Sequence, residues 1–155
     1  MVIGTAAALA GLILLAPVAG SKKPVVRRRN PDTVHPPTGY THLVEVSGGR
    51  TLYVAGQIAL DRTGTLVGAG DFKAQARQVF ENLKAVLAAG GAGFDDVVKI
   101  TVFLTDISDL AAFREVRNAY FPKELPASTL VQVQRLARPE LMLEVEAVAV
   151  VSAAP

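Results

Sequence analysis

Two carboxylates near the end of the chain lie in a segment that is otherwise apolar. Glu144 and Glu146 belong to Leu143–Val150, in which all the remaining residues are leucine, valine or alanine. This pattern is typical of a β-strand, and side chains two residues apart share one face of a strand. A carboxylate among aliphatic side chains is costly unless it is paired or hydrogen-bonded. The two acids therefore mark either an ion pair with a basic residue across the sheet or a working acid and base.

Other kinds of catalytic centre are not indicated. The chain has no cysteine, which excludes disulfides, thiolate metal sites and a cysteine nucleophile. His35 and His42 are the only histidines, and they lie in or beside a proline-rich segment without acidic partners at metal-ligand spacing. No Gly-x-Ser-x-Gly motif is present, so a triad hydrolase is not expected. We expect no metal and no cofactor.

The elements that must position the acids follow from the spacing of apolar residues. Apolar side chains at steps of three and four predict two helices, and β-branched runs predict the strands. The expected elements are strands at 41–46 and 51–55 that form a hairpin, a helix from Asp71 to Gly90, a buried strand at 97–104, a helix at 110–120, and closing strands at 126–133 and 143–150. This order predicts an α+β fold with two helices on one face of a mixed sheet.

Several of these segments, in this order, resemble one known family. They are Tyr53–Ile58, Gln75–Lys84, Asp96–Leu104 and the two closing strands from Pro126 onward. Through them, residues 27–151 resemble the RidA/YjgF family, which includes the reactive-intermediate (2-imino/enamino acid) deaminases. The resemblance implies a chorismate-mutase-like fold that assembles into a homotrimer with clefts between the subunits.

The resemblance also implies which residues form the site. Glu144 matches the acid that helps to place the hydrolytic water in relatives, where one carboxyl group near the water can serve both water addition and protonation of the leaving nitrogen. Tyr40 matches the tyrosine that borders the family's cleft. In active deaminases a Pro-Ala-Arg-Ser segment supplies the arginine that holds the substrate carboxylate. The corresponding segment here is Pro126–Thr129, with Ser128 in place of the arginine.

The serine at this position changes what the cleft can bind. A guanidinium grips a carboxylate with two charge-assisted hydrogen bonds, whereas a hydroxyl gives one neutral bond. Losing a charged hydrogen bond costs on the order of 1.5–3 kcal/mol, so we expect a 2-imino acid to bind poorly. Thr129 offers a second hydroxyl on the opposite face of the strand. Arg114, on the second predicted helix, either reaches the pocket from its own or a neighbouring subunit or lies on a solvated helix face.

Three classes of function are compatible with this pattern. The first is an imine or enamine hydrolase of altered substrate range that uses Glu144, Tyr40 and the hydroxyls of Ser128 and Thr129. The second is a non-catalytic module that binds a ligand or a regulatory partner in the same cleft. A ribonuclease-type translation inhibitor fits less well, because the domain is acidic and has no interleaved aromatic and basic residues. We expect a small metabolite and further copies of the chain as partners, without specific nucleic acid.

The charge of the chain is unevenly distributed. The formal net charge is +2, but five basic side chains lie within residues 22–29. Residues 30–155 hold the remaining 11 basic side chains against 14 acidic ones, which is a net charge of −3. A mildly acidic domain offers no broad attraction for phosphate backbones.

The chain divides into three parts, two of them in its N-terminal region. Residues 1–25 are apolar as far as Val18 and read as a signal-like segment, a membrane anchor or a spurious extension. Residues 26–39 form a basic, proline-rich arm, and residues 40–152 form the RidA-like domain. We expect a cytoplasmic protein if residues 1–25 are an artefact, and an exported or membrane-anchored one otherwise. Membrane contact is expected only if that segment is retained.

Overall fold

The computed structural model describes residues 23–153. The interpretation of residues 1–25 therefore falls almost entirely outside the described residues. Across residues 23–153, neither helix combines the length and the apolar character that crossing a membrane requires.

The order of elements predicted from residue 41 onward is confirmed, and one strand precedes it. The described elements are β1 (Val25–Arg29), β2 (Leu43–Ser47), β3 (Arg50–Gln57), α1 (Phe72–Ala89), the 3-10 turn η1 (Phe94–Asp96), β4 (Val97–Leu104), η2 (Ile107–Asp109), α2 (Leu110–Tyr120), β5 (Ala127–Gln132) and β6 (Leu143–Val151).

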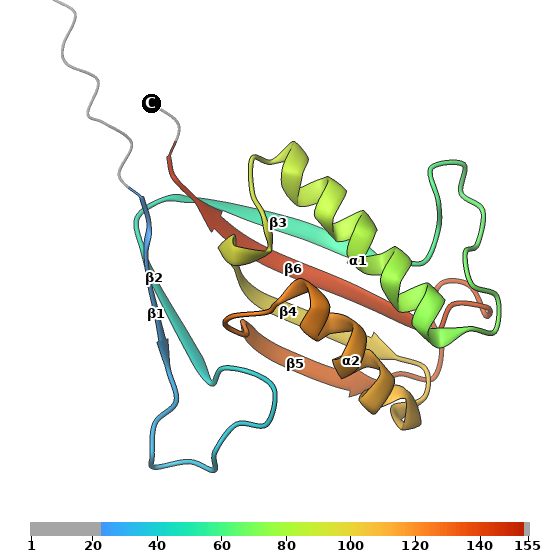
Figure 1. Cartoon of the computed structure of the whole chain (residues 1–155), viewed down its shortest axis with the longest axis horizontal. Helices are drawn as coiled ribbons and strands as arrows, with labels where there is room; N and C mark the ends of the chain where they lie inside the picture. Colours follow the sequence, from blue (N-terminus) through green and yellow to red (C-terminus); the bar gives the residue numbers. More distant parts are fainter. Residues whose placement is uncertain (1–22, 154–155) are drawn as a thin grey trace, which may run out of the picture.

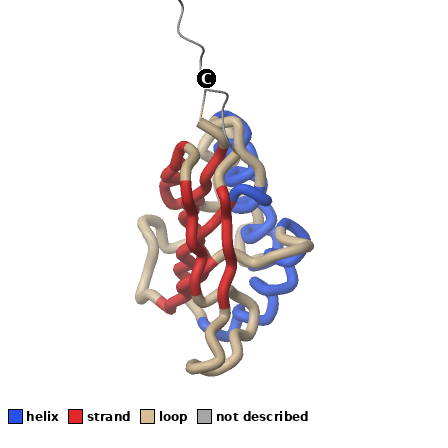
Figure 2. The backbone as a smooth tube through the Cα atoms, turned by 90° about the vertical axis from the view of Figure 1, so that its left-hand side faces the viewer, coloured by secondary structure: helices blue, strands red, loops and turns tan. Residues whose placement is uncertain are grey.

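The main sheet has four strands in the order β3-β6-β4-β5. Strand β6 is antiparallel to both β3 and β4, whereas β4 and β5 are parallel, so the sheet is mixed as predicted. A parallel pair needs a crossover connection, and α2 is that connection. Both helices cover the same face of the sheet and leave the other face bare (Figures 1 and 2).

The hydrophobic core lies between the helices and the covered face. Alternate residues of β4 and β6 point into it, among them Ile100, Val102 and Val145, each at most 1% exposed. From α1, Phe80 and Leu83 pack against them and are equally buried. Because strand residues alternate between faces, the residues between these positions point to the bare face. The apolar packing thereby fixes which side chains of β4, β5 and β6 reach each face.

The predicted hairpin between the first two strands is wrong. Strand β2 pairs with β1 in a separate two-stranded ribbon, while β3 pairs with β6 (Figure 1). Charge favours the observed ribbon, since Glu45 on β2 forms ion pairs with Arg27 at 3.8 Å and Arg29 at 2.8 Å on β1. The turn at residues 48–49 therefore passes the chain from one sheet to the other. The basic part of the arm predicted over residues 26–39 is a paired strand.

Candidate functional site

A pocket of about 300 Å³ lies between α2, β5 and the segment that precedes β2. Three of the residues predicted from the sequence, Tyr40, Arg114 and Ser128, line it together. Arg117, one helical turn beyond Arg114, lines it as well. Arg114 is exposed to solvent and also borders this pocket of its own chain.

The segment that carries Tyr40 forms one wall of the pocket and is hydrogen-bonded to the residues just before β5. The backbone N–H of Thr41 donates to the carbonyl oxygen of Pro126 at 3.1 Å, and its hydroxyl donates to that of Leu125 at 2.6 Å. The hydroxyl of Tyr40 lies 2.8 Å from Nε2 of His35, and the ring of His42 meets the Tyr40 ring edge-on. The two histidines thus act as hydrogen-bonding and packing residues around Tyr40.

Two arginines of α2 donate hydrogen bonds to the backbone of the same segment. Nη2 of Arg114 donates to the carbonyl oxygen of Thr38 at 3.2 Å, and Nη1 of Arg117 donates to that of Gly39 at 2.6 Å. Gly39 has a φ of +90°, a conformation that side chains disfavour. A Cβ atom there would lie 3.3 Å from Nη2 of Arg117 and 3.6 Å from Nε of Arg114. The positive φ therefore favours glycine, and a Cβ atom would crowd Nη2 of Arg117.

Arg117 is a charged residue inside the protein, only 4% exposed. Burial lowers the pKa of its guanidinium, and the neighbouring charge of Arg114 lowers it further. Among the described residues, neither arginine forms an ion pair. The pocket therefore combines two positive charges with a lining that, within residues 23–153, contains no acid.

Glu144 lies on the opposite side of the sheet from this pocket. Ser128 pairs with Ile100, a core residue on the helix-covered face. Glu144 pairs with Phe103, on the alternate set of β4 positions that points to the bare face. Within one chain, Ser128 and Glu144 therefore cannot line the same pocket.

Thr129 also faces away from the pocket. It pairs with Thr101, which in turn pairs with Glu146, so its hydroxyl lies on the bare face. There it accepts a hydrogen bond from Nζ of Lys99 at 2.6 Å. The structure thus places Thr129 with the acids and not with Ser128, and the two adjacent hydroxyls do not act together within one chain.

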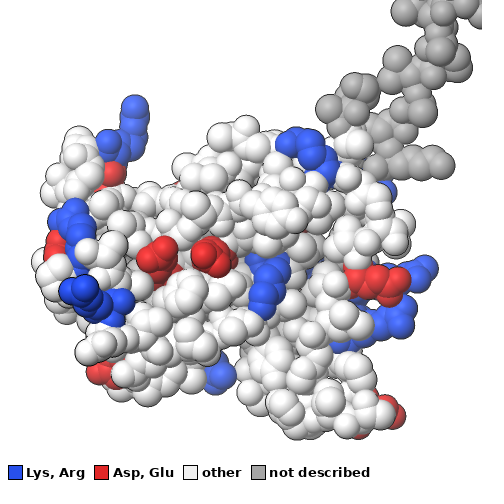
Figure 3. All heavy atoms as spheres, turned by 180° about the vertical axis from the view of Figure 1, so that it is seen from behind, with Lys and Arg blue, Asp and Glu red and all other residues white. Residues whose placement is uncertain are grey.

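The side chain of Glu144 lies directly against the backbone of β3. A Cβ atom on Gly56 would fall 1.8 Å from Oε1 of Glu144, so only glycine leaves room for this carboxylate. The ion pair considered as an alternative role for Glu144 is not found, because no described residue forms one with it or with Glu146. Figure 3 shows acidic side chains near the centre of this largely uncharged face. The half-buried acid is thus available to a ligand or water.

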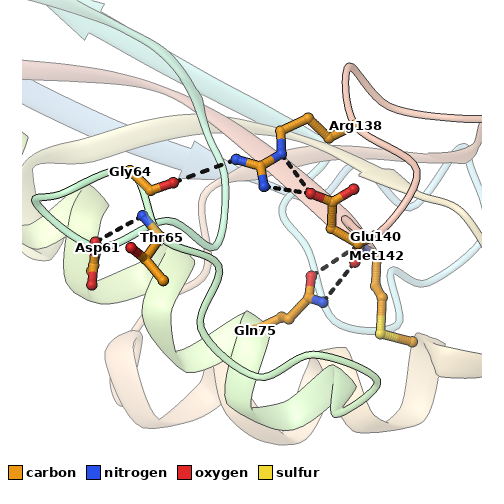
Figure 4. A network of polar contacts seen from close by, with 7 residues as sticks. All are labelled: Asp61, Gly64, Thr65, Gln75, Arg138, Glu140 and Met142. Atoms are coloured by element: carbon orange, nitrogen blue, oxygen red, sulfur yellow. Dashed lines mark hydrogen bonds and ion pairs between the residues drawn. The ribbon is translucent and has the colours of Figure 1, made fainter.

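The start of β6, which carries Glu144, is held in place by a buried amide (Figure 4). Gln75 of α1 is fully buried; its amide donates to the carbonyl oxygens of Gly68 at 3.2 Å and Glu140 at 2.9 Å, and accepts from the N–H of Met142 at 2.9 Å. Arg138 binds the Glu140 carboxylate through Nε at 2.6 Å, and a backbone hydrogen bond and this arginine lower the pKa of Glu140. These contacts set the position from which Glu144 projects.

Sequence reasoning gave neither Gln75 nor Arg117 a role. Both could have been found by the same signal, a polar residue at a position of the helix that faces the core. Gln75 follows the buried Phe72 by three residues, and Arg117 follows the buried Phe113 by four. Across residues 23–153, no cluster of three or more potential metal-binding side chains occurs.

The sequence of the chain is similar to those of known proteins. The sequence pattern of the family described as Endoribonuclease L-PSP matches residues 31–151. A RutC family protein of Pyrococcus horikoshii is 45% identical over 105 residues, which cover 67% of this chain and 82% of that protein. The 2-iminobutanoate/2-iminopropanoate deaminase of Mus musculus is 38% identical over 111 residues, covering 72% and 80% respectively.

Solved structures show the same fold. The crystal structure of YyfB from Yersinia pestis, described as a protein of unknown function of the Rid family, gives a TM-score of 0.75 at 40% identity and covers 81% of this chain and 98% of its own. RidA from an Antarctic Psychrobacter gives a TM-score of 0.61 at 40% identity, covering 74% and 89%.

Proposed function

Because the chain belongs to the RidA/YjgF family, whose sequence pattern is described as Endoribonuclease L-PSP, we propose that it hydrolyses imine or enamine intermediates with an altered substrate range. Support comes from relatives named 2-iminobutanoate/2-iminopropanoate deaminase in mouse and rat. The altered range follows from Ser128, which lines the pocket where those enzymes are expected to carry an arginine.

One observation carries this proposal: a pocket with binding groups and an unpaired carboxylate lie on opposite faces of one sheet. For Glu144 to act on a molecule bound beside Ser128, the acid must come from another copy of the chain. We therefore propose a homotrimer in which each cleft takes Tyr40, Arg114 and Ser128 from one subunit and Glu144 from its neighbour. Light scattering that gives the mass of a stable monomer would contradict this arrangement.

The proposed reaction requires one acid–base group. The Glu144 carboxylate takes a proton from water as the water oxygen bonds to the imine carbon, and it returns a proton to the nitrogen. In the carbinolamine that results, the carboxylate takes the hydroxyl proton and passes it to the nitrogen as the carbon–nitrogen bond breaks, so that ammonia leaves and a carbonyl compound remains. A positioned carboxyl group of this kind contributes typically 10²–10⁴-fold to a rate.

A non-catalytic ligand-binding or regulatory module is the second candidate, and Ser128 is the observation that favours it. An assay of ammonia release from imines, made in situ by an amino-acid oxidase, separates the two. The hydrolase predicts a rate above the uncatalysed one that is lost in Glu144→Ala and kept in Glu146→Ala, the acid two residues along the same strand face. A wild-type protein without activity that gains it on Ser128→Arg is the result expected of the binding module.

A further inference from the structure

We infer that Arg114 and Arg117 together bind the carboxylate of a short-chain acid in the pocket, and so take over the role of the missing arginine at residue 128. This inference rests on the proposed function, because it identifies the class of ligand for the same pocket. It assigns carboxylate recognition to helix α2 instead of strand β5.

The charge of the pocket is the first support. Its charged lining residues, within the described part of the chain, are Arg114 and Arg117. The hydrogen bonds of Arg117 go to neutral oxygens only, the carbonyl of Gly39 and the side-chain amide of Asn118. A buried charge that meets only neutral partners is costly, and a bound anion would offset that cost.

The arrangement of the two guanidinium groups is the second support. Both approach the same point, since a Cβ atom on Gly39 would meet Arg117 and Arg114 within 3.3–3.6 Å. The backbone contacts of Thr38 and Gly39 hold the groups in place before any ligand arrives. A guanidinium group suits a planar carboxylate, and two of them bordering one pocket bring two positive charges to it.

The rest of the pocket indicates what accompanies the carboxylate. Ile107, Leu110 and Leu130 provide an apolar lining, and Ser128 adds one neutral hydroxyl. With a volume of about 300 Å³, the pocket suits a small acid with a short aliphatic chain. Holding the acid group from α2 would displace the reacting carbon relative to enzymes that hold it from β5, which accounts for an altered substrate range.

The experiment compares butanoate with the neutral butanamide, followed by NMR shifts of the isotope-labelled full chain. Butanoate should shift the backbone signals of residues 38–40 and bind at least tenfold more tightly than butanamide. Arg114→Gln should weaken butanoate binding by about tenfold to a hundredfold, the effect of losing a charged hydrogen bond. Arg62→Gln removes an exposed arginine outside the pocket and should change it less than twofold.

Because Arg117 is buried, its variant needs a check on folding. Arg117→Lys keeps the positive charge but loses the planar fork, and it should weaken butanoate while a near-native spectrum shows an intact fold. Equal binding of butanoate and butanamide, or an Arg114→Gln protein with unchanged affinity, would overturn the inference. Methyl phosphate bound tenfold more tightly than butanoate would overturn the ligand class.

These outcomes are independent of the proposed reaction. Carboxylate binding that depends on Arg114, without any ammonia release, would uphold this inference and remove the hydrolase. Ammonia release that depends on Glu144, without preference for carboxylates over amides, would do the reverse.

Discussion

The two faces of the main sheet hold different candidate groups, two arginines beside a pocket on one face and, on the other, an acid without an ion-pair partner within residues 23–153. On the helix-covered side, Arg114 and Arg117 border a pocket without an acid among the described residues. On the bare side, Glu144 has no basic partner in the part of the chain that the structure describes. In the proposed function, the groups that bind and the group that transfers protons share one sheet and are separated by its backbone. Under the proposed function, one chain therefore holds two halves of a site.

The largest expected effect comes from separating the two halves on different chains. Glu144→Gln should lower ammonia release by about a hundredfold or more, because a positioned general acid–base group is lost. Arg114→Gln should lower it through weaker binding. When the two variants are unfolded and refolded together, mixed assemblies should regain activity, since some clefts then receive both intact residues from different subunits.

The control for this experiment is each variant refolded alone. Activity in the mixture that equals the average of the two separate samples would show that both residues serve one chain. The placement of the arginines and Glu144 on opposite faces would then no longer imply a cleft formed by two subunits.

A smaller effect is expected at Gly39, where the binding half depends on backbone geometry. Gly39→Ala should destabilise the fold by about 1–2 kcal/mol through its positive φ. It should also weaken butanoate binding, because the new Cβ atom would crowd Nη2 of Arg117 at 3.3 Å and shift that guanidinium group. Thermal unfolding and NMR titration measure the two effects.

Gly48 provides a matched control for this substitution. Its φ of +76° is similar, but a Cβ atom there would meet nothing within 4 Å. Gly48→Ala should therefore carry the backbone cost without the loss of affinity. If both variants bind butanoate as wild type does, the guanidinium groups do not form the binding half.

The smallest effect is expected from Lys99, the basic residue that borders the same hollow on the bare face as Glu146. Lys99→Met removes its hydrogen bond to Thr129 and should cost about 1 kcal/mol of unfolding free energy or less. Ammonia release should change less than twofold in the coupled assay. A tenfold loss would show that the acidic half does depend on a base.

Much of the fold could be predicted because its elements have strong local signals. The apolar stripe of α1, its N-cap Asp71, which accepts a hydrogen bond from the N–H of Ala74, and the β-branched run at 97–104 all appear where the sequence indicates. The pairing of β2 was mispredicted, because local turn residues do not reveal that Arg27 and Arg29 compete for it.

The composition of the site could be predicted better than its layout. Tyr40, Arg114 and Ser128 were expected near one cleft, and the structure brings them into one pocket. Which face each strand residue occupies depends on register between strands distant in sequence, so the separation of Ser128 from Glu144 was not foreseeable. The roles of Arg117 and Gln75 depend on their burial, which a search for motifs does not detect but which helix periodicity could have indicated.

The crossover through α2 has a consequence for how such proteins can diverge. Apart from the short Thr38–Tyr40 segment, every residue of the pocket comes from one continuous stretch, Ile107–Leu130, whereas the carboxylate belongs to the later strand β6. Mutations in that stretch can change which molecule is recognised while leaving the acid untouched. Under the proposed function, selection can thus vary the choice of ligand and the capacity for reaction as two separate heritable traits.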